Sequence, residues 1–302
     1  MLKQTSFSES SFHYPLDIDF AFTAKPQDEK PADVNPINQV SINYIHSPVH
    51  LCQSSSSFNA LILVKSGLDN YEHRSVIRQT WFTELARNNM RAAFILGTTM
   101  NESQAQLVDQ EATLHRDIIQ YDLIDSYYNN TYKAMAALRW QKQMCSNNRF
   151  KYLVMMDDDY YVNVPKLRHY VESNQNEGDF VAGYLYTSSQ PKRIPGLKWF
   201  TSLEEYEYSR WPVYPSGGFY ILSKYTADRI SRAFPYVKYS RYDDALIGII
   251  LLKLKIISTQ EGNLFMLTPP LFVSSYLDIV SAHTISNPQL IYKVWHSLHP
   301  AE

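Results

Sequence analysis

Short apolar runs of strand length recur along the chain from residue 58 onwards. Four of them span residues 58–64, 91–97, 118–121 and 150–156. The segments between them have helical length and span residues 72–88, 102–114 and 128–146. Apolar strands that alternate with helices are typical of a parallel sheet covered on both faces. Ligands of such sheets bind beyond the carboxyl ends of the strands. The pattern therefore predicts an α/β fold with a site at that edge.

The two ends of the chain follow a different pattern. After residue 179 the strands are more mixed, at residues 179–183 and 219–222, and a helix is predicted over residues 242–253. Residues 1–57 contain five of the fifteen prolines and none of the nine glycines, and no periodicity persists there. We interpret residues 1–57 as a stem or tail and residues 58–302 as one domain.

Composition narrows the class of protein. Hydrophobic residues make up 45% of the 302 residues, which is enough for a sizeable core. The 28 basic and 30 acidic residues give a net charge of −2, which argues against a nucleic-acid binder. Two cysteines, Cys52 and Cys145, are too few for a four-cysteine zinc site. No apolar run reaches the length of a transmembrane helix, so composition by itself predicts a soluble cytosolic protein.

Three consecutive carboxylates, Asp157, Asp158 and Asp159, directly follow the apolar run 150–156. They repel one another, so burying them is costly without a compensating cation. Because alternate side chains of a strand share a face, Asp157 and Asp159 should point the same way. Two such carboxylates suit Mg²⁺ or Mn²⁺, which commonly binds a diphosphate as well. A solvated turn is the alternative, but the apolar residues 160–162 that follow hold the acids near the core.

A second acidic pair, Asp243 and Asp244, opens the predicted helix 242–253. Acids in a first helical turn interact favourably with the helix dipole and cap NH groups. Alternatively, one of them is a general base, since a carboxylate can take a proton from a sugar hydroxyl within hydrogen-bond reach. The sequence leaves both explanations open. Upstream, Gly217 and Gly218 predict a turn that enters a strand and permits a close backbone approach to a ligand.

Several other chemistries lack their motifs in this sequence. It contains no Gly-rich phosphate loop followed by lysine, no dinucleotide fingerprint, no His-Glu-x-x-His, no Cys-x-x-Cys and no serine elbow. A metal-bound diphosphate is the strongest chemistry left. A metal-dependent phosphoryl-transfer enzyme would also use the aspartate triplet, but it leaves the segment Arg74–Trp81 and the pair Gly217 and Gly218 unexplained.

Six segments in order give the sequence a resemblance to the β-1,3-galactosyltransferase family, over about residues 58–296. This family includes β-1,3-N-acetylglucosaminyltransferases and has the Fringe proteins as distant relatives. The segments are Arg74–Trp81, Phe94–Gly97, Asp117–Lys133, Asp157–Asn163, Tyr214–Ser223 and Asp243–Gly248. The resemblance implies a GT-A fold, with a mostly parallel central sheet flanked by helices and a smaller sheet on the acceptor side. It also implies inverting transfer of a sugar from a UDP-sugar to the 3-hydroxyl of an acceptor sugar.

The resemblance assigns a metal site to this chain. Asp159 would bind Mn²⁺ directly, and His283 aligns with a late histidine of the family and would be the other protein ligand. Asp157 and Asp158 would support the metal or contact the ribose.

The same resemblance assigns the reacting groups. Asp244 would be the general base, with Asp243 beside it in place of the family's glutamate. Arg74, Arg78 and Lys133 are the expected contacts of the uridine and the diphosphate. Since each proposed catalytic group is present, we expect activity rather than a silent sugar-binding relative.

Substrate and location also follow only from the resemblance. Galactose is the expected donor sugar, with N-acetylglucosamine and N-acetylgalactosamine as alternatives, and the acceptor is expected to be a glycan on a glycoprotein or glycolipid. Family members are held on the lumenal side of the Golgi membrane by an anchor that is absent from this chain. Cys52 and Cys145 resemble family cysteines, which implies a disulfide between them and fits a secretory lumen.

Overall fold

The protein is built around one mixed sheet of eight strands. The computed structural model describes residues 3–14, 35–38, 41–53, 56–145, 150–174, 178–284 and 287–300. In spatial order the strands are β1 (Tyr44–His46), β4 (Ile118–Ile124), β3 (Met90–Thr98), β2 (Phe58–Lys65), β5 (Phe150–Asp157), β8 (Tyr214–Ser223), β7 (Val181–Tyr186) and β9 (Thr259–Gln260). Strands β4, β3, β2 and β5 are parallel, whereas β8 runs antiparallel to both β5 and β7. The predicted α/β fold with a mostly parallel central sheet is confirmed.

A second, smaller sheet lies beside the end of β5. It contains β10 (Phe265–Met266), β11 (Ser281–His283) and β6 (Tyr160–Val162). The antiparallel register of β11 and β6 pairs His283 with Tyr160. This pairing brings a residue from the end of the chain next to the acidic triplet, and it confirms the expected smaller sheet.

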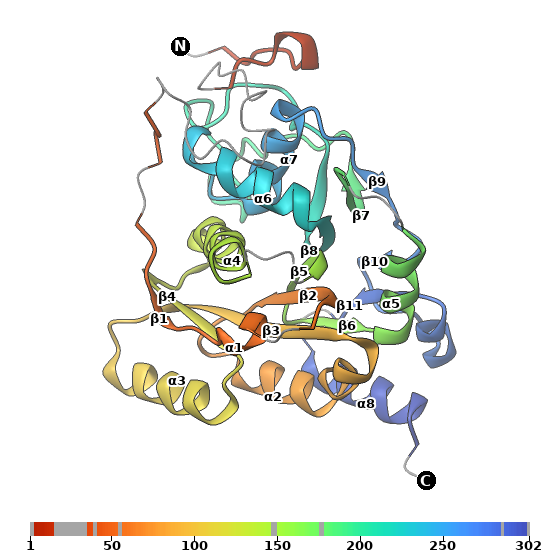
Figure 1. Cartoon of the computed structure of the whole chain (residues 1–302). Helices are drawn as coiled ribbons and strands as arrows, with labels where there is room; N and C mark the ends of the chain where they lie inside the picture. The colour runs from red at the N-terminus through yellow and green to blue at the C-terminus, as the bar shows by residue number, and fades with distance from the viewer. Residues whose placement is uncertain are drawn as a thin grey trace.

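Helices cover both faces of the central sheet (Figure 1). One face carries α2 (Tyr71–Gln79), α3 (Glu102–His115) and α8 (Pro288–Leu298), and the other carries α4 (Asn130–Met144), α6 (Lys224–Ala233) and α7 (Asp243–Lys253). Strand β2 shows why both faces are needed, because its alternate residues enter two separate cores. Ile62 and Val64 pack on the α2 side, whereas Leu61 and Leu63 pack on the α4 side.

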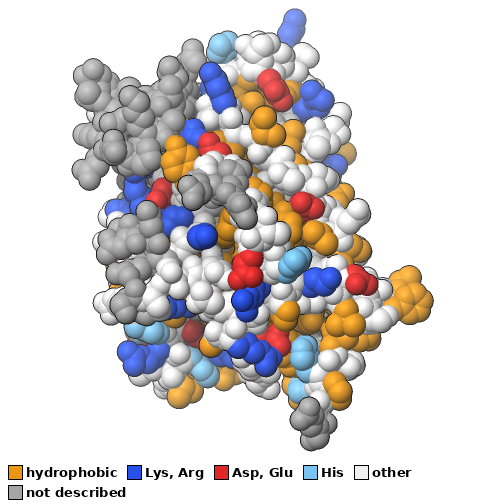
Figure 2. Space-filling model, turned by 45° about the vertical axis from the view of Figure 1, so that its right-hand side comes forward, with side chains coloured by type: hydrophobic (Ala, Val, Ile, Leu, Met, Phe, Trp, Pro, Cys, Tyr) orange, Lys and Arg blue, Asp and Glu red, His pale blue; other side chains and the backbone are white. Residues whose placement is uncertain are grey.

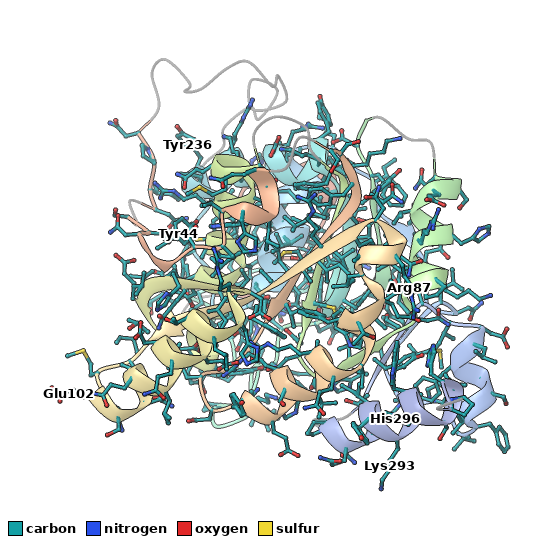
Figure 3. All side chains as sticks on the ribbon, turned by 60° about the horizontal axis from the view of Figure 1, so that its bottom comes forward. Tyr44, Arg87, Glu102, Tyr236, Lys293 and His296 are labelled. Atoms are coloured by element: carbon teal, nitrogen blue, oxygen red, sulfur yellow. A yellow bond between two sulfur atoms is a disulfide. The ribbon has the colours of Figure 1, made fainter. Side chains whose placement is uncertain are left out.

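Helix α8 has one buried side and carries polar side chains on its outer side. On α8, Ile291 and Trp295 are buried, while Lys293 and His296 lie on the outer side of the helix (Figure 3). On the face drawn in Figure 2, basic and acidic side chains are interspersed. Within the described residues, no helix combines the length and the apolar character that crossing a membrane requires.

Two predicted elements differ in the structure. The helix expected over residues 72–88 ends at Gln79, because Thr80 leaves the helical conformation and Trp81 turns into the core. Two short 3-10 helices, Trp81–Glu84 and Ala86–Asn88, follow it. The turn expected at Gly217 and Gly218 is also wrong, because both glycines lie inside β8.

The described parts of residues 1–57 pack against the domain. Strand β1 extends the central sheet at β4, and the rings of Phe12 and Tyr14 are buried. The short helix α1 (His50–Gln53) carries Cys52, which forms a disulfide with Cys145 at a Cα–Cα distance of 5.1 Å. The pairing expected from the family resemblance is therefore confirmed. The remaining elements are α5 (Val164–Ser173) and the 3-10 helices Glu9–Ser11, Tyr127–Asn129, Phe234–Tyr236 and Val273–Leu277.

Candidate active site

The two acidic segments meet at the carboxyl ends of β2 and β5. Lys65 ends β2 and pairs in register with Asp157, which ends β5. Its ammonium Nζ lies 3.0 Å from Asp157 Oδ1 and 2.6 Å from Asp243 Oδ2, at the start of α7. Burial alone would lower the pKa of Lys65, but the two carboxylates raise it well above its ordinary value. A buried charged lysine thus joins the acidic triplet to the acidic pair.

Sequence reasoning did not name Lys65. The available signal was a lysine directly after the apolar run 58–64, where a buried parallel strand would otherwise continue. A lysine is almost never buried without a partner, so its place at the end of such a strand indicates nearby carboxylates. The run itself does not say which carboxylates they are.

Asp244 lies beside this bridge and is half-buried. Its Oδ1 accepts a hydrogen bond from the backbone NH of Ala245 at 2.7 Å, as the helix-end explanation predicts. Burial, and then the charge of Asp243, raise the pKa of Asp244 to about 7. A carboxylate that titrates near neutral pH is also suited to general base catalysis. The two explanations of this residue are therefore compatible.

The acidic triplet forms a strand end and a turn, since β5 ends at Asp157. Its members point to different partners. Asp158 accepts hydrogen bonds from the Ser66 hydroxyl and from Asn70 Nδ2, the latter at 2.9 Å. Burial raises the pKa of Asp157 against the charge of Lys65, and the Asp159 carboxylate adds to the rise. Asp157 and Asp159 therefore act on each other electrostatically, while Asp158 binds the loop after β2.

Asp159 and His283 form the pair that the resemblance assigned to the metal. His283 Nε2 lies 2.8 Å from Asp159 Oδ2, and this hydrogen bond raises the pKa of His283. The backbone NH and the hydroxyl of Thr284 both donate to the Asp159 carbonyl at 2.7 Å. Within the described residues, no group of three or more His, Cys, Asp and Glu side chains could hold a metal. Carboxylate and imidazole groups both bind metal ions in proteins, so the residue types of this pair suit the metal site that the resemblance implies.

Two of the three predicted basic residues converge on the loop after β2. Lys133 Nζ donates to the Ser66 carbonyl at 2.6 Å and pairs with Asp125 at 3.0 Å. Arg74 Nη1 donates to the Ser66 hydroxyl at 2.9 Å. Since that hydroxyl donates to Asp158, both cations support the segment that holds the triplet.

Arg78 lies one step further from the triplet. It makes two hydrogen bonds of 2.8 Å to Asp117 and one of 2.7 Å to Glu111. Glu111 also receives two hydrogen bonds from Arg74, at 2.8 and 2.7 Å. The structure therefore brings Lys133 and Arg74 to the loop after β2, and places Arg78 in an ion-pair cluster behind it.

The glycine pair allows β8 to pass close to two site elements. A Cβ atom added at Gly218 would lie 2.4 Å from the Tyr160 hydroxyl, and one added at Gly217 would lie 3.3 Å from Asp244 Cβ. Neither glycine has a positive φ, so the close approach is the reason for glycine here. The neighbours are side chains of the site, whereas the sequence predicted an approach to a ligand.

Comparisons with known proteins agree on one family. Residues 72–261, more than half of the chain, match the family model "Galactosyltransferase". The chain is 32% identical to "Beta-1,3-galactosyltransferase brn" of Drosophila melanogaster, over 97% of this chain and 88% of that protein. It is 30% identical to human "Beta-1,3-galactosyltransferase 5", over 88% of each chain.

A solved glycosyltransferase involved in glycosylation of the major capsid of PBCV-1 aligns with 78% of this chain and 99% of its own. Its TM-score is 0.43 and its sequence identity is 7%. The conclusion rests on the sequence matches, which cover most of the chain at about 30% identity. This protein is a glycosyltransferase that belongs to the galactosyltransferase family.

Proposed function

We propose that the protein is an inverting β-1,3-glycosyltransferase that moves galactose from UDP-galactose to the 3-hydroxyl of an acceptor glycan on a glycoprotein or glycolipid. The observation that carries the proposal is that Lys65 forms ion pairs with both Asp157 and Asp243, which brings the two acidic segments to one site. The donor sugar is supported by the names of the relatives, which are β-1,3-galactosyltransferases. N-acetylglucosamine and N-acetylgalactosamine are the alternative donor sugars.

In this proposal Asp244 is the general base. It takes the proton of the acceptor hydroxyl while that oxygen attacks the anomeric carbon on the face opposite UDP. Inversion at an α-linked donor then gives a β product, through a transition state with oxocarbenium character, as in inverting glycoside hydrolysis. Asp243, fixed by Lys65, holds the start of α7 so that the neighbouring Asp244 keeps its position.

Asp159 and His283 would hold Mn²⁺, which when bound supplies positive charge to stabilise the departing diphosphate. Asp158, fixed by Ser66 and Asn70, keeps the loop after β2 beside the nucleotide. Lys133 and Arg74 hold that loop through hydrogen bonds to Ser66. Arg78 helps to position Arg74, because both residues bind Glu111. We expect these basic residues to position the loop, whereas stabilisation of the leaving group is the expected contribution of Asp159 and His283, which would hold the metal.

A lumenal Golgi location is part of the proposal and rests on the resemblance. The disulfide between Cys52 and Cys145 supports it, because disulfides persist in the secretory lumen and are rare in the cytosol.

The test is an assay of transfer with purified protein, Mn²⁺, and separately UDP-galactose, UDP-N-acetylglucosamine and UDP-N-acetylgalactosamine. The acceptors are methyl β-glycosides, and the product linkage is determined by NMR. We expect a β-1,3-galactoside, and loss of Mn²⁺-dependent UDP binding in Asp159→Ala. Transfer of a different sugar would replace the donor assignment. UDP binding with no product from any pair would instead indicate a silent sugar-binding relative.

A further inference from the structure

One tryptophan of this protein is exposed, in contrast to the other four. Trp81, Trp140, Trp211 and Trp295 are all buried, whereas 53% of the Trp199 surface is exposed. It lies in the connection between β7 and β8, residues 187–213, which passes beside α7 (Figure 1). Exposure of so large an apolar ring costs solvation free energy without stabilising the core. An exposed tryptophan that is held in place offers a rigid apolar surface to a ligand.

Trp199 is held in place by a second exposed aromatic side chain. Its indole Nε1 donates a hydrogen bond of 3.0 Å to the hydroxyl of Tyr127, whose surface is 45% exposed. The ammonium of Lys198 lies 4.8 Å from the centroid of the Tyr127 ring and 5.4 Å from that of the Trp199 ring. The hydrogen bond joins segments 72 residues apart, so the two rings form one fixed aromatic surface.

This aromatic surface, formed by Tyr127 and Trp199, is tied to the residues that precede the candidate base. The Tyr242 hydroxyl donates to the carbonyl of Phe200 at 2.7 Å, next to Trp199. On the other side, the Tyr239 hydroxyl donates to the carbonyl of Tyr128 at 2.9 Å, next to Tyr127. The backbone next to each ring is thus held by a tyrosine that precedes Asp244 by five residues or fewer.

A third hydrogen bond joins the segment that follows Tyr127 to residues 239–242. The Thr131 hydroxyl donates to the carbonyl of Ser240 at 2.6 Å. The electrostatics agree, because burial and then the nearby carboxylates of Asp244 and Asp243 raise the pKa of Tyr127 against the hydrogen bond from Trp199. The aromatic surface therefore lies on the side of the base, whereas Asp158 and Asn70 mark the side of the loop after β2.

We infer that Tyr127 and Trp199 form a stacking platform for a pyranose ring of the acceptor glycan. A pyranose has an apolar CH face that packs on an aromatic ring, while its hydroxyls at the edge remain available to polar groups. A ring held there would present a neighbouring hydroxyl to Asp244. The inference deepens the proposed function, on which it rests, and it assigns acceptor recognition in part to the connection between β7 and β8, which the sequence motifs did not single out.

The experiment compares Trp199→Ala and Trp199→Phe with the wild-type protein and with Tyr292→Ala, which removes an exposed aromatic ring from α8. Initial rates are measured with Mn²⁺ and UDP-galactose while methyl N-acetyl-β-glucosaminide is varied, and again with the donor varied. We expect Trp199→Ala to raise the KM for the acceptor about tenfold and to leave the KM for the donor unchanged. Trp199→Phe keeps a ring and should retain most of the affinity, and Tyr292→Ala should match the wild type.

A binding readout separates this inference from the proposed function. Acrylamide quenching of tryptophan fluorescence is measured with Mn²⁺ and UDP, with and without each methyl β-glycoside, so no transfer occurs. The difference between the wild type and Trp199→Phe isolates the exposed indole, which the acceptor should protect. Protection without any transfer would reject the proposed function and retain the platform. The platform would be overturned if no glycoside protected the indole. It would also be overturned if Trp199→Ala left the acceptor KM unchanged, or raised the KM for the donor rather than that for the acceptor.

Discussion

Two charged clusters of this protein lie near each other and differ in how their charges balance. The closed cluster consists of Arg74, Arg78, Glu111 and Asp117. The open cluster consists of Lys65, Asp157, Asp158, Asp159, Asp243, Asp244 and His283. In the closed cluster two guanidiniums face two carboxylates, and all four side chains are paired. The open cluster has five carboxylates and only one lysine and one histidine, and these two pair with Asp157, Asp243 and Asp159.

The difference indicates separate roles for the two clusters. The closed cluster needs no further ligand, because each of its charges already has a partner of opposite sign. The open cluster has an excess of negative charge, and such an arrangement is stable only with neutralisation by protons or by a cation. We therefore expect changes in the closed cluster to act on stability, and changes in the open cluster to act on catalysis and metal binding.

The largest expected effect tests the open cluster. Asp244→Asn keeps the shape of the side chain but cannot accept a proton, so the transfer rate should fall by a factor of about 10² to 10⁴. Mn²⁺-dependent binding of UDP, measured by calorimetry, should stay close to that of the wild type. Asp278→Asn, an exposed aspartate after the 3-10 helix Val273–Leu277, is the matched control. Loss of UDP binding in Asp244→Asn would show that this residue contacts the donor.

The next effect tests the closed cluster. The Arg74 side chain is only 1% exposed, and its partner Glu111 is also buried. Replacing Arg74 by Met leaves a buried carboxylate with one cation fewer, which should cost about 3–5 kcal/mol in the free energy of unfolding. Urea denaturation measures this cost, and the double variant Arg74→Met with Glu111→Gln should recover part of it. Asp244→Asn should lose no stability. If Arg74→Met and Asp244→Asn lowered the free energy of unfolding by the same amount, the distinction between the clusters would not hold.

The sequence predicted the elements of the fold better than it predicted these partnerships. Strands β2, β3 and β5 coincide closely with their apolar runs, because burial on both faces requires continuous apolar residues. The glycine pair was assigned to a turn, since its true place depends on the pairing of β8 with β5 and β7. Local sequence does not show such long-range register.

The candidate site was predictable in its residue types and not in its contacts. The acidic triplet and the pair Asp243 and Asp244 stand out in the sequence. Their link does not, because Lys65 and Asp243 are 178 positions apart. Likewise, nothing in the sequence pairs Arg74 with Glu111, and His283 was named only through the family resemblance. Charge balance is a property of the folded chain, and so the closed cluster could not be distinguished from the open one beforehand.

A smaller effect concerns pH, for which the two clusters should behave in opposite ways. The pKa of Asp244 is raised from 3.8 to about 7, so folding binds a proton between these pH values and stability falls as the pH rises through them. Arg74 and Arg78 lower the pKa of Glu111 against the effect of burial. Its contribution is therefore present above the ordinary value of 4.5 and is lost only as the pH falls through the lowered pKa.

Unfolding free energies of the wild type, Asp244→Asn and Glu111→Gln at pH 5 and pH 8 test this difference. The advantage of Asp244→Asn over the wild type should be larger at pH 8, where the half-buried carboxylate of the wild type is ionised. The deficit of Glu111→Gln should be the same at both pH values, because Glu111 is ionised throughout. A deficit that changes as much as the Asp244→Asn advantage would contradict the assignment of the two clusters.

The smallest effect separates two adjacent glycines of β8. In Gly218→Ala the new methyl group would lie 2.4 Å from the Tyr160 hydroxyl, so the ring must move. That ring lies 5.1 Å from the ring of His283, and Tyr160 directly follows Asp159. The displacement should therefore weaken Mn²⁺-dependent UDP binding. In Gly217→Ala the methyl group would lie 3.3 Å from Asp244 Cβ, which a displacement of Asp244 by a few tenths of an ångström can relieve.

The two glycine variants serve as controls for each other, because they change neighbouring residues of one strand by the same methyl group. We expect Gly218→Ala to raise the dissociation constant of UDP measured with Mn²⁺, and to leave metal-free binding unchanged. Gly217→Ala should instead lower the transfer rate slightly, since only the base is displaced. Gly217→Ala could instead impair UDP binding as much as Gly218→Ala does. In that case the base Asp244 would also act on donor binding, and the separate roles given to Asp244 and Asp159 would be wrong.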